Sequence, residues 1–143
     1  MDNIRDIIRL LNNDTEVKYC ALATVLSVDK SANTCDVEPL DNTAELVEVR
    51  LQAGNGKGLV MYPVVGSVVV VSFFSRDDAY VSLVSEVELF DIQTQNESLK
   101  AIITDLCSAI KTLTVTTPSG PSGTPINFAQ FDTITNRLNN LFK

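Results

Sequence analysis

The sequence contains no histidine and only three cysteines in its 143 residues. Without histidine the chain lacks the usual general base near neutral pH and the commonest metal ligand. Cys20, Cys35 and Cys107 show no C-x-x-C spacing, so neither a zinc site nor a dithiol site is indicated. We expect each cysteine to be a small buried apolar residue, and we expect no enzyme activity, no catalytic residues, no metal and no cofactor.

Positive charge is also scarce. The chain carries 11 Lys and Arg residues against 18 Asp and Glu residues, a formal net charge of −7. Residues 15–90 have a net charge of −6, because five basic residues (Lys18, Lys30, Arg50, Lys57, Arg76) face eleven acidic ones (Glu16, Asp29, Asp36, Glu38, Asp41, Glu45, Glu48, Asp77, Asp78, Glu86, Glu88). A phosphate backbone would meet a repulsive average field, so we expect no nucleic-acid partner.

Long apolar runs are missing as well. The longest, Leu59 to Phe74, is interrupted by Pro63, Gly66 and Ser67 and is shorter than the roughly 20 residues that a membrane-spanning helix needs. We interpret it as part of a core and expect no stable membrane anchor. The start MDNIRDIIRLL has no basic region followed by a purely apolar stretch, so we expect no secretory signal and synthesis in a reducing cytoplasm.

The densest β signal lies in residues 47–90. Val68 to Phe74 and Tyr80 to Val87 flank a short polar stretch at 75–79, a pattern typical of a hairpin. The four consecutive valines at 68–71 leave neither face of the first strand polar, which indicates a closed barrel, a partner subunit, or both. The period of two along a strand predicts one core-facing set (Val69, Val71, Phe73, Val81, Leu83) and an opposite-facing pair (Phe74, Tyr80).

Five strands are predicted in all, at 17–28, 34–40, 46–51, 67–74 and 80–87. A long first strand and a glycine-rich connection between the third and fourth favour a five-stranded Greek-key barrel of the OB type over residues 15–90.

Two loop motifs can each be interpreted either as a ligand-binding site or as a plain connection. The glycine-rich loop Gly54–Gly58 could hold a phosphate, but a Walker loop needs a helix after its lysine, and a β-type run follows here, so a plain connection is favoured. Asp77 and Asp78 could begin a calcium loop, but no ladder of acidic or amide side chains follows them, so a solvated hairpin tip is favoured.

Amphipathic helices are predicted at both ends of the chain. In the first region, residues 1–14, Ile4, Ile7, Ile8 and Leu11 form one stripe. Residues 91–143 predict two helices, over 97–113 and 128–143, joined by a connector rich in Pro, Gly, Ser and Thr. Their stripes offer more apolar surface than one helical pair hides, so we expect a homo-oligomer. The candidate interface residues are Leu99, Ile103, Leu106, Ile110, Leu113, Phe131, Ile134, Leu138 and Leu141.

Several segments of the barrel region resemble the OB domain of bacteriophage baseplate central-spike and hub proteins. They are V-x-S-V-D at 25–29, C-D-V at 35–37, V-R-L-Q-A-G at 49–54, G-K-G-L-V-M-Y-P-V-V-G-S-V-V-V-V at 56–71 and A-Y-V at 79–81. The resemblance covers about residues 20–87.

The resemblance implies a structural virion protein of a phage tail, or of a phage-like contractile injection machine, made in the host bacterial cytoplasm. In that family the OB domains form a trimer on the tail axis and contact other tail or baseplate proteins. Spikes of this group continue into a β-helical needle, whereas residues 97–143 are predicted helical, which favours a hub or adaptor role. The alternative is an OB-fold module that binds single-stranded nucleic acid, which would require aromatic side chains on an electropositive groove.

Overall fold

The computed structural model describes residues 20–143 except residues 55, 76 and 77. The elements in chain order are β1 (Cys20–Asp29), β2 (Thr34–Pro39), β3 (Leu46–Arg50), β4 (Leu59–Pro63), β5 (Val68–Ser75), β6 (Asp78–Val84), β7 (Val87–Ile92), α2 (Leu99–Lys111), β8 (Thr116–Thr117), β9 (Gly120–Pro121) and α3 (Phe128–Leu141). The helix predicted over residues 2–12 lies outside the described residues.

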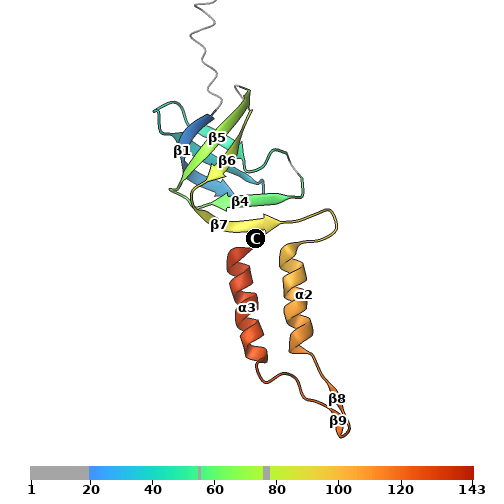
Figure 1. The fold of residues 1–143 in the computed structure, drawn as a ribbon. Coiled ribbons are helices and arrows are strands. Elements are labelled where there is room, and N and C mark those ends of the chain that lie inside the picture. The colour runs from blue at the N-terminus through green and yellow to red at the C-terminus, as the bar shows by residue number, and fades with distance from the viewer. Residues whose placement is uncertain (1–19, 55, 76–77) are drawn as a thin grey trace, which may run out of the picture.

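Five of the strands form a closed barrel in the order β1-β2-β3-β6-β5, with β5 returning to β1 (Figure 1). All neighbours are antiparallel except β3 and β6, which pair in parallel through Arg50 and Tyr80. These are the five strands expected from the sequence. The predicted fold, a mainly β chain with an OB-type five-stranded barrel and a C-terminal pair of helices, is therefore confirmed.

The barrel core is built from alternate residues of these strands, because every second side chain points inward. Val25 on β1, Val37 on β2, Val49 on β3, and Val69 and Val71 on β5 are buried. Cys35 is buried among them, as expected, and this burial raises the pKa of its thiol to about 12. Valine suits these positions because its branched side chain packs well on a pleated surface.

One core assignment was wrong. Leu83 is 65% exposed, although strict alternation would place it inside with Val81. The register shifts between Val70 paired with Leu83 and Val71 paired with Val81, so an irregularity in β6 reverses the alternation. Val84 packs against the core instead, and Phe73 is only partly buried. Phe74 is exposed and stacks on Tyr80, with ring centroids 4.7 Å apart, as their predicted common face requires.

A similar irregularity occurs in β3. Glu48 has a positive φ of 58°, and the register with β2 shifts between Cys35 and Val37. The Asp36 carboxylate accepts a hydrogen bond of 2.9 Å from the Glu48 backbone N–H, which supports this left-handed residue. As a result Val49 remains buried, while Val47 is turned outward and is 68% exposed.

The sequence did not predict a second, two-stranded sheet formed by β4 and β7 at one end of the barrel (Figure 1). The apolar stretch from Leu59 to Phe74 is divided by a turn in which Gly66 has a φ of 87° and donates a 2.8 Å hydrogen bond to the carbonyl of Val25. A residue with a Cβ rarely adopts that φ, so Gly66 is needed there. From β4, Tyr62 enters the core completely buried.

The two helices form a hairpin that extends away from the β4–β7 end of the barrel (Figure 1). They are antiparallel, because Lys111 near the end of α2 forms an ion pair of 2.5 Å with Asp132 near the start of α3. Ser98 caps α2 by accepting a hydrogen bond from the Ala101 N–H at 3.1 Å. The predicted connector between the helices contains the short β8–β9 ribbon at its far end.

Candidate functional site

No group of three or more histidine, cysteine, aspartate or glutamate side chains is arranged to hold a metal ion within residues 20–54, 56–75 and 78–143. None of the helices in this part of the chain is long and apolar enough to cross a lipid bilayer. The candidate sites lie on surfaces that the fold leaves exposed.

The helical hairpin carries all nine predicted interface residues. Its buried side chains are Cys107 on α2 and Leu138 on α3. Of the candidate residues, Leu138 is thus internal to the hairpin, and three others are half-buried: Ile103, Ile110 and Phe131. The remaining five stay exposed: Leu99, Leu106, Leu113, Ile134 and Leu141. About half of each stripe therefore serves the hairpin itself, and the other half is left at its surface.

The exposed half lies on one side of the hairpin. Successive residues of an α-helix rotate by about 100°, so on α2 Leu99, Leu106 and Ile102 form a strip beside the buried Cys107. On α3, Ile134 and Leu141 lie beside the buried Leu138. Because the two helices are antiparallel, these two strips fall on the same side of the pair. Leu106 is 57% exposed in the middle of this surface, and Ile102, unlike Cys107, is also exposed.

The opposite side of the hairpin is polar. It carries Thr104, Ser108 and Lys111 from α2 and Asp132 and Thr135 from α3. The hydroxyls of Thr104, Ser108 and Thr135 donate to backbone carbonyls of their own helices. The hairpin is thus two-sided, and its apolar side is the one suited to bury against another surface. The apolar side also contains a hollow of about 420 Å³ on α3, which is lined by Ile134, Arg137, Leu138 and Leu141.

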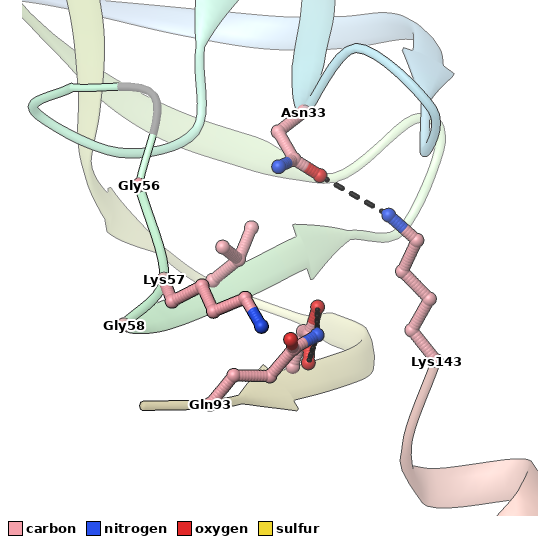
Figure 2. A pocket seen from close by; sticks show the side chains of 8 residues that line it. Asn33, Gly56, Lys57, Gly58, Gln93 and Lys143 are labelled. Atoms are coloured by element: carbon pink, nitrogen blue, oxygen red, sulfur yellow. Dashed lines mark hydrogen bonds between the residues drawn. The ribbon is translucent and has the colours of Figure 1, made fainter. Parts of the chain in front are cut away.

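A second, polar hollow of about 210 Å³ lies between the barrel and the end of α3 (Figure 2). The glycine-rich loop supplies Gly56, Lys57 and Gly58, and Asp91 and Gln93 lie opposite. The amide nitrogen of Gln93 donates to both carboxylate oxygens of Asp91, at 2.7 and 2.6 Å. Lys57 and Asp91 both line this hollow. The negative charge of the Asp91 carboxylate offsets the positive charge of Lys57, so the hollow does not favour a bound anion.

Lys143 enters the same hollow from the other side, where its ammonium group is already bound. It donates to the Tyr62 hydroxyl at 2.7 Å, to Asn33 Oδ1 at 3.2 Å, as drawn in Figure 2, and to the carbonyl of Lys30. The nitrogen also lies 4.9 Å from the centre of the Tyr62 ring, within the range of a cation–π contact. Because the three donor hydrogens of the ammonium have three acceptors, this lysine is a structural anchor and not a free ligand-binding charge.

We call this contact, formed by Lys143, Tyr62 and Asn33, the anchor. Further bonds reinforce it: the Lys143 N–H donates to the carbonyl of Phe90 at 2.9 Å, and Lys100 donates to the carbonyl of Phe142 at 3.1 Å. The end of α3 is therefore held on β7 and on the barrel. No sequence motif marks these residues, because positions 33, 62 and 143 are far apart in the chain.

The barrel surface near β3 and β6 bears on the nucleic-acid alternative. The Phe74 ring is stacked on the Tyr80 ring. The Arg50 guanidinium lies 5.5 Å from the centre of the Phe74 ring. Arg50 is itself paired with Asp78 at 2.5 Å, so Asp78 belongs to an ion pair at the hairpin. A stacking platform for bases requires open ring faces and unpaired positive charge. Here the aromatic side chains and the arginine contact one another instead.

The cysteines are divided between core and surface. Cys35 and Cys107 are buried, as expected for small apolar residues, whereas Cys20 is exposed. The expectation was wrong for Cys20 because the period of two places it with Leu22 on the outer face of β1.

Comparison with known proteins gives no family assignment: no family model, no curated protein and no solved structure matches this chain.

Proposed function

We propose that the protein is a structural subunit of a phage tail baseplate hub or spike, or of a phage-like contractile injection machine, and that it assembles as a homotrimer on the tail axis. The observation that carries this proposal is the apolar side of the helical hairpin, centred on Leu106, which the described part of the chain leaves exposed. Neighbouring copies of the same hairpin would cover it.

Two features make self-association a reasonable explanation for this surface. The exposed leucines and isoleucines recur at the three- and four-residue spacings of a bundle seam, so a second copy presents a matching set. The anchor holds the hairpin on the barrel, so the seam would bring the barrels together at one end of the assembly. A rigid subunit of this kind suits a structural role in a virion.

The threefold symmetry and the place in the tail come from the resemblance of residues 20–87 to baseplate central-spike and hub OB domains. A closed barrel with the strand order β1-β2-β3-β6-β5 supports that resemblance at the level of fold. Since the barrel is followed by a helical hairpin, a hub or adaptor that contacts adjoining tail proteins is a better proposal than a piercing needle.

The proposal is tested by placing a charge in the centre of the apolar side. In Leu106→Asp the carboxylate would have to be desolvated in the seam, so light scattering should show a loss of the assembly to monomer. Ser108→Asp is the matched control, because Ser108 is exposed on the polar side of the same helix, and it should keep the parent mass. A Leu106→Asp variant that retains the full assembly would show that the hairpin is not the interface.

A further inference from the structure

The outer face of the barrel carries a second apolar surface, on β1, β5 and β6. Leu22 pairs with Val70, and Val70 pairs with Leu83, so the three side chains form one row across adjacent strands. Leu22 is 54% exposed and Leu83 is 65% exposed. Val68, paired with Thr24, extends the row along β5. We call these four residues, Leu22, Val68, Val70 and Leu83, the outer row.

The outer row itself contains no charged side chain, although the whole chain has a net charge of −7, and the carboxylate of Asp78, at the start of β6 on this face, is paired with Arg50. Further outward positions of these strands are uncharged: Cys20, Thr24, Ser72, Phe74, Tyr80 and Ser82. Closure of the barrel accounts for the inward valines Val69 and Val71, but it does not explain why Val68 and Val70 are apolar as well. An uncharged apolar row of this kind indicates a surface that is covered by another segment.

A hollow at the beginning of β1 continues this surface. It measures about 350 Å³ and is lined by Cys20, Ala21, Leu22, Leu40 and Asp41. The Leu40 N–H donates to the Leu22 carbonyl at 2.9 Å, which holds the exposed Leu40 side by side with the outer row. Cys20, the first residue of β1, lines this hollow, so β1 begins at the edge of the apolar outer face.

The first part of the chain contains a segment that suits this surface. Residues 2–12 have the helical stripe Ile4, Ile7, Ile8 and Leu11, with Asp and Arg residues elsewhere. We propose that this segment docks as an amphipathic helix on the outer row, with its stripe against Leu22, Val70 and Leu83. Its Arg5 and Arg9 would stay in solvent.

The connection is long enough for such docking. Residues 13–19 span up to about 25 Å when extended, whereas the outer row crosses three strands, a distance of about 10 Å. A helix of 11 residues is about 16 Å long, comparable with the barrel strands that it would cover. Because the segment is tethered beside the surface, its effective concentration is high, and it has an advantage over a second copy, which must give up free translation and rotation.

Limited digestion of the full chain with trypsin tests the proposal, because docking should protect the bonds after Arg5 and Arg9. Leu83→Asp places a charge in the outer row and should accelerate cleavage at those bonds about tenfold or more. Val47→Asp is the matched control: Val47 is equally exposed but lies on β3, away from the outer row, and cleavage should stay at the parent rate. Since Leu83 is exposed, its substitution leaves the barrel core intact.

A second measurement identifies the occupant. In a Cys20→Ser background, Ile8→Cys with Leu83→Cys should form a disulfide within one chain under mild oxidation, whereas Ile8→Cys with Val47→Cys should not. Equal cleavage of the parent and Leu83→Asp proteins would overturn the proposal. So would a Leu83→Asp variant that loses mass in light scattering while cleavage is unchanged, because the outer row would then be covered by a second copy. The Leu106→Asp result on the hairpin is independent of both outcomes.

Discussion

The ammonium nitrogen of Lys143 lies 2.7 Å from the hydroxyl oxygen of Tyr62, although 81 positions separate the two residues in the chain. Tyr62 is fully buried in β4, and its hydroxyl also donates to Asn33 Oδ1 at 2.6 Å. The contact thus connects the end of α3 to the barrel core through a single buried side chain. It explains how a hairpin that extends away from the barrel keeps a defined orientation.

Lys143→Met should loosen this connection. The substitution keeps most of the aliphatic stem but removes the donors to Tyr62 and Asn33, so we expect a loss of about 1 kcal/mol in the free energy of unfolding. Faster hydrogen exchange should appear at the backbone N–H groups of Phe142 and Lys143, which bond to Leu138 and Phe90.

Lys57→Met is the control for that variant, since Lys57 lines the same hollow but makes no hydrogen bond or ion pair with the described residues. Its stability should stay within about 0.5 kcal/mol of the parent. If both lysine variants changed the free energy of unfolding equally, the anchor would contribute nothing specific, and the bridge between Phe90 and Phe142 and the bond from Lys100 would hold the hairpin without it.

Stability should also depend on pH through Asp36. A hydrogen bond from the Ser27 hydroxyl at 2.7 Å, followed by the one from the Glu48 N–H, holds the pKa of this carboxyl below its ordinary value of 3.8. A lowered pKa in the folded state means that the stabilisation is present above pH 3.8 and is lost as the pH falls through the folded-state value. Urea unfolding at pH 7 and pH 3 should therefore show that Asp36→Asn is less stable than the parent at pH 7 and that the difference narrows at pH 3.

Glu38→Gln serves as the comparison, because Glu38 is an exposed carboxylate on the same strand without a hydrogen-bond partner in the described chain. The two substitutions remove the same charge, but only one removes the support of the positive φ at Glu48. If the free energy of unfolding of Asp36→Asn equalled that of Glu38→Gln at both pH values, the role given to Asp36 would be contradicted.

The barrel could be predicted because its signal is local. Alternation of buried and exposed residues along β1, β2 and β5 follows directly from the period of two, and the turns between strands contain the expected polar residues. The helical pair was likewise predictable from the three- and four-residue spacing of Leu99, Ile103 and Leu106. These patterns need no knowledge of which segments meet in space.

The remaining features depend on pairing between distant segments. The register shift that turns Leu83 outward is set by how β6 meets β5, and a one-residue irregularity reverses every later side chain. The β4–β7 sheet arises from the pairing of Leu59 with Ile92, 33 positions away. The anchor is a further case, because neither Lys143 nor Tyr62 has a sequence context that distinguishes it. The division of the helical stripes into internal and exposed halves also required the position of the second helix.

Single-stranded nucleic acid should not bind. The net charge of −6 over residues 15–90 and the pairing of Arg50 with Asp78 disfavour binding to a phosphate backbone. A fluorescence anisotropy titration with a short labelled strand at low salt should show no saturable binding. Micromolar affinity that weakens as salt is raised would instead favour the single-strand-binding alternative over the structural one.

The mass of the protein in solution tests the central claim most directly. The apolar side of the hairpin, with Leu106 at its centre, is expected to be covered by two neighbouring copies. Light scattering over a range of concentrations should therefore give three times the 15.6 kDa mass of the chain. A mass of 15.6 kDa at high micromolar concentration would contradict the account, because the exposed seam would then be a surface that the protein does not use for self-association.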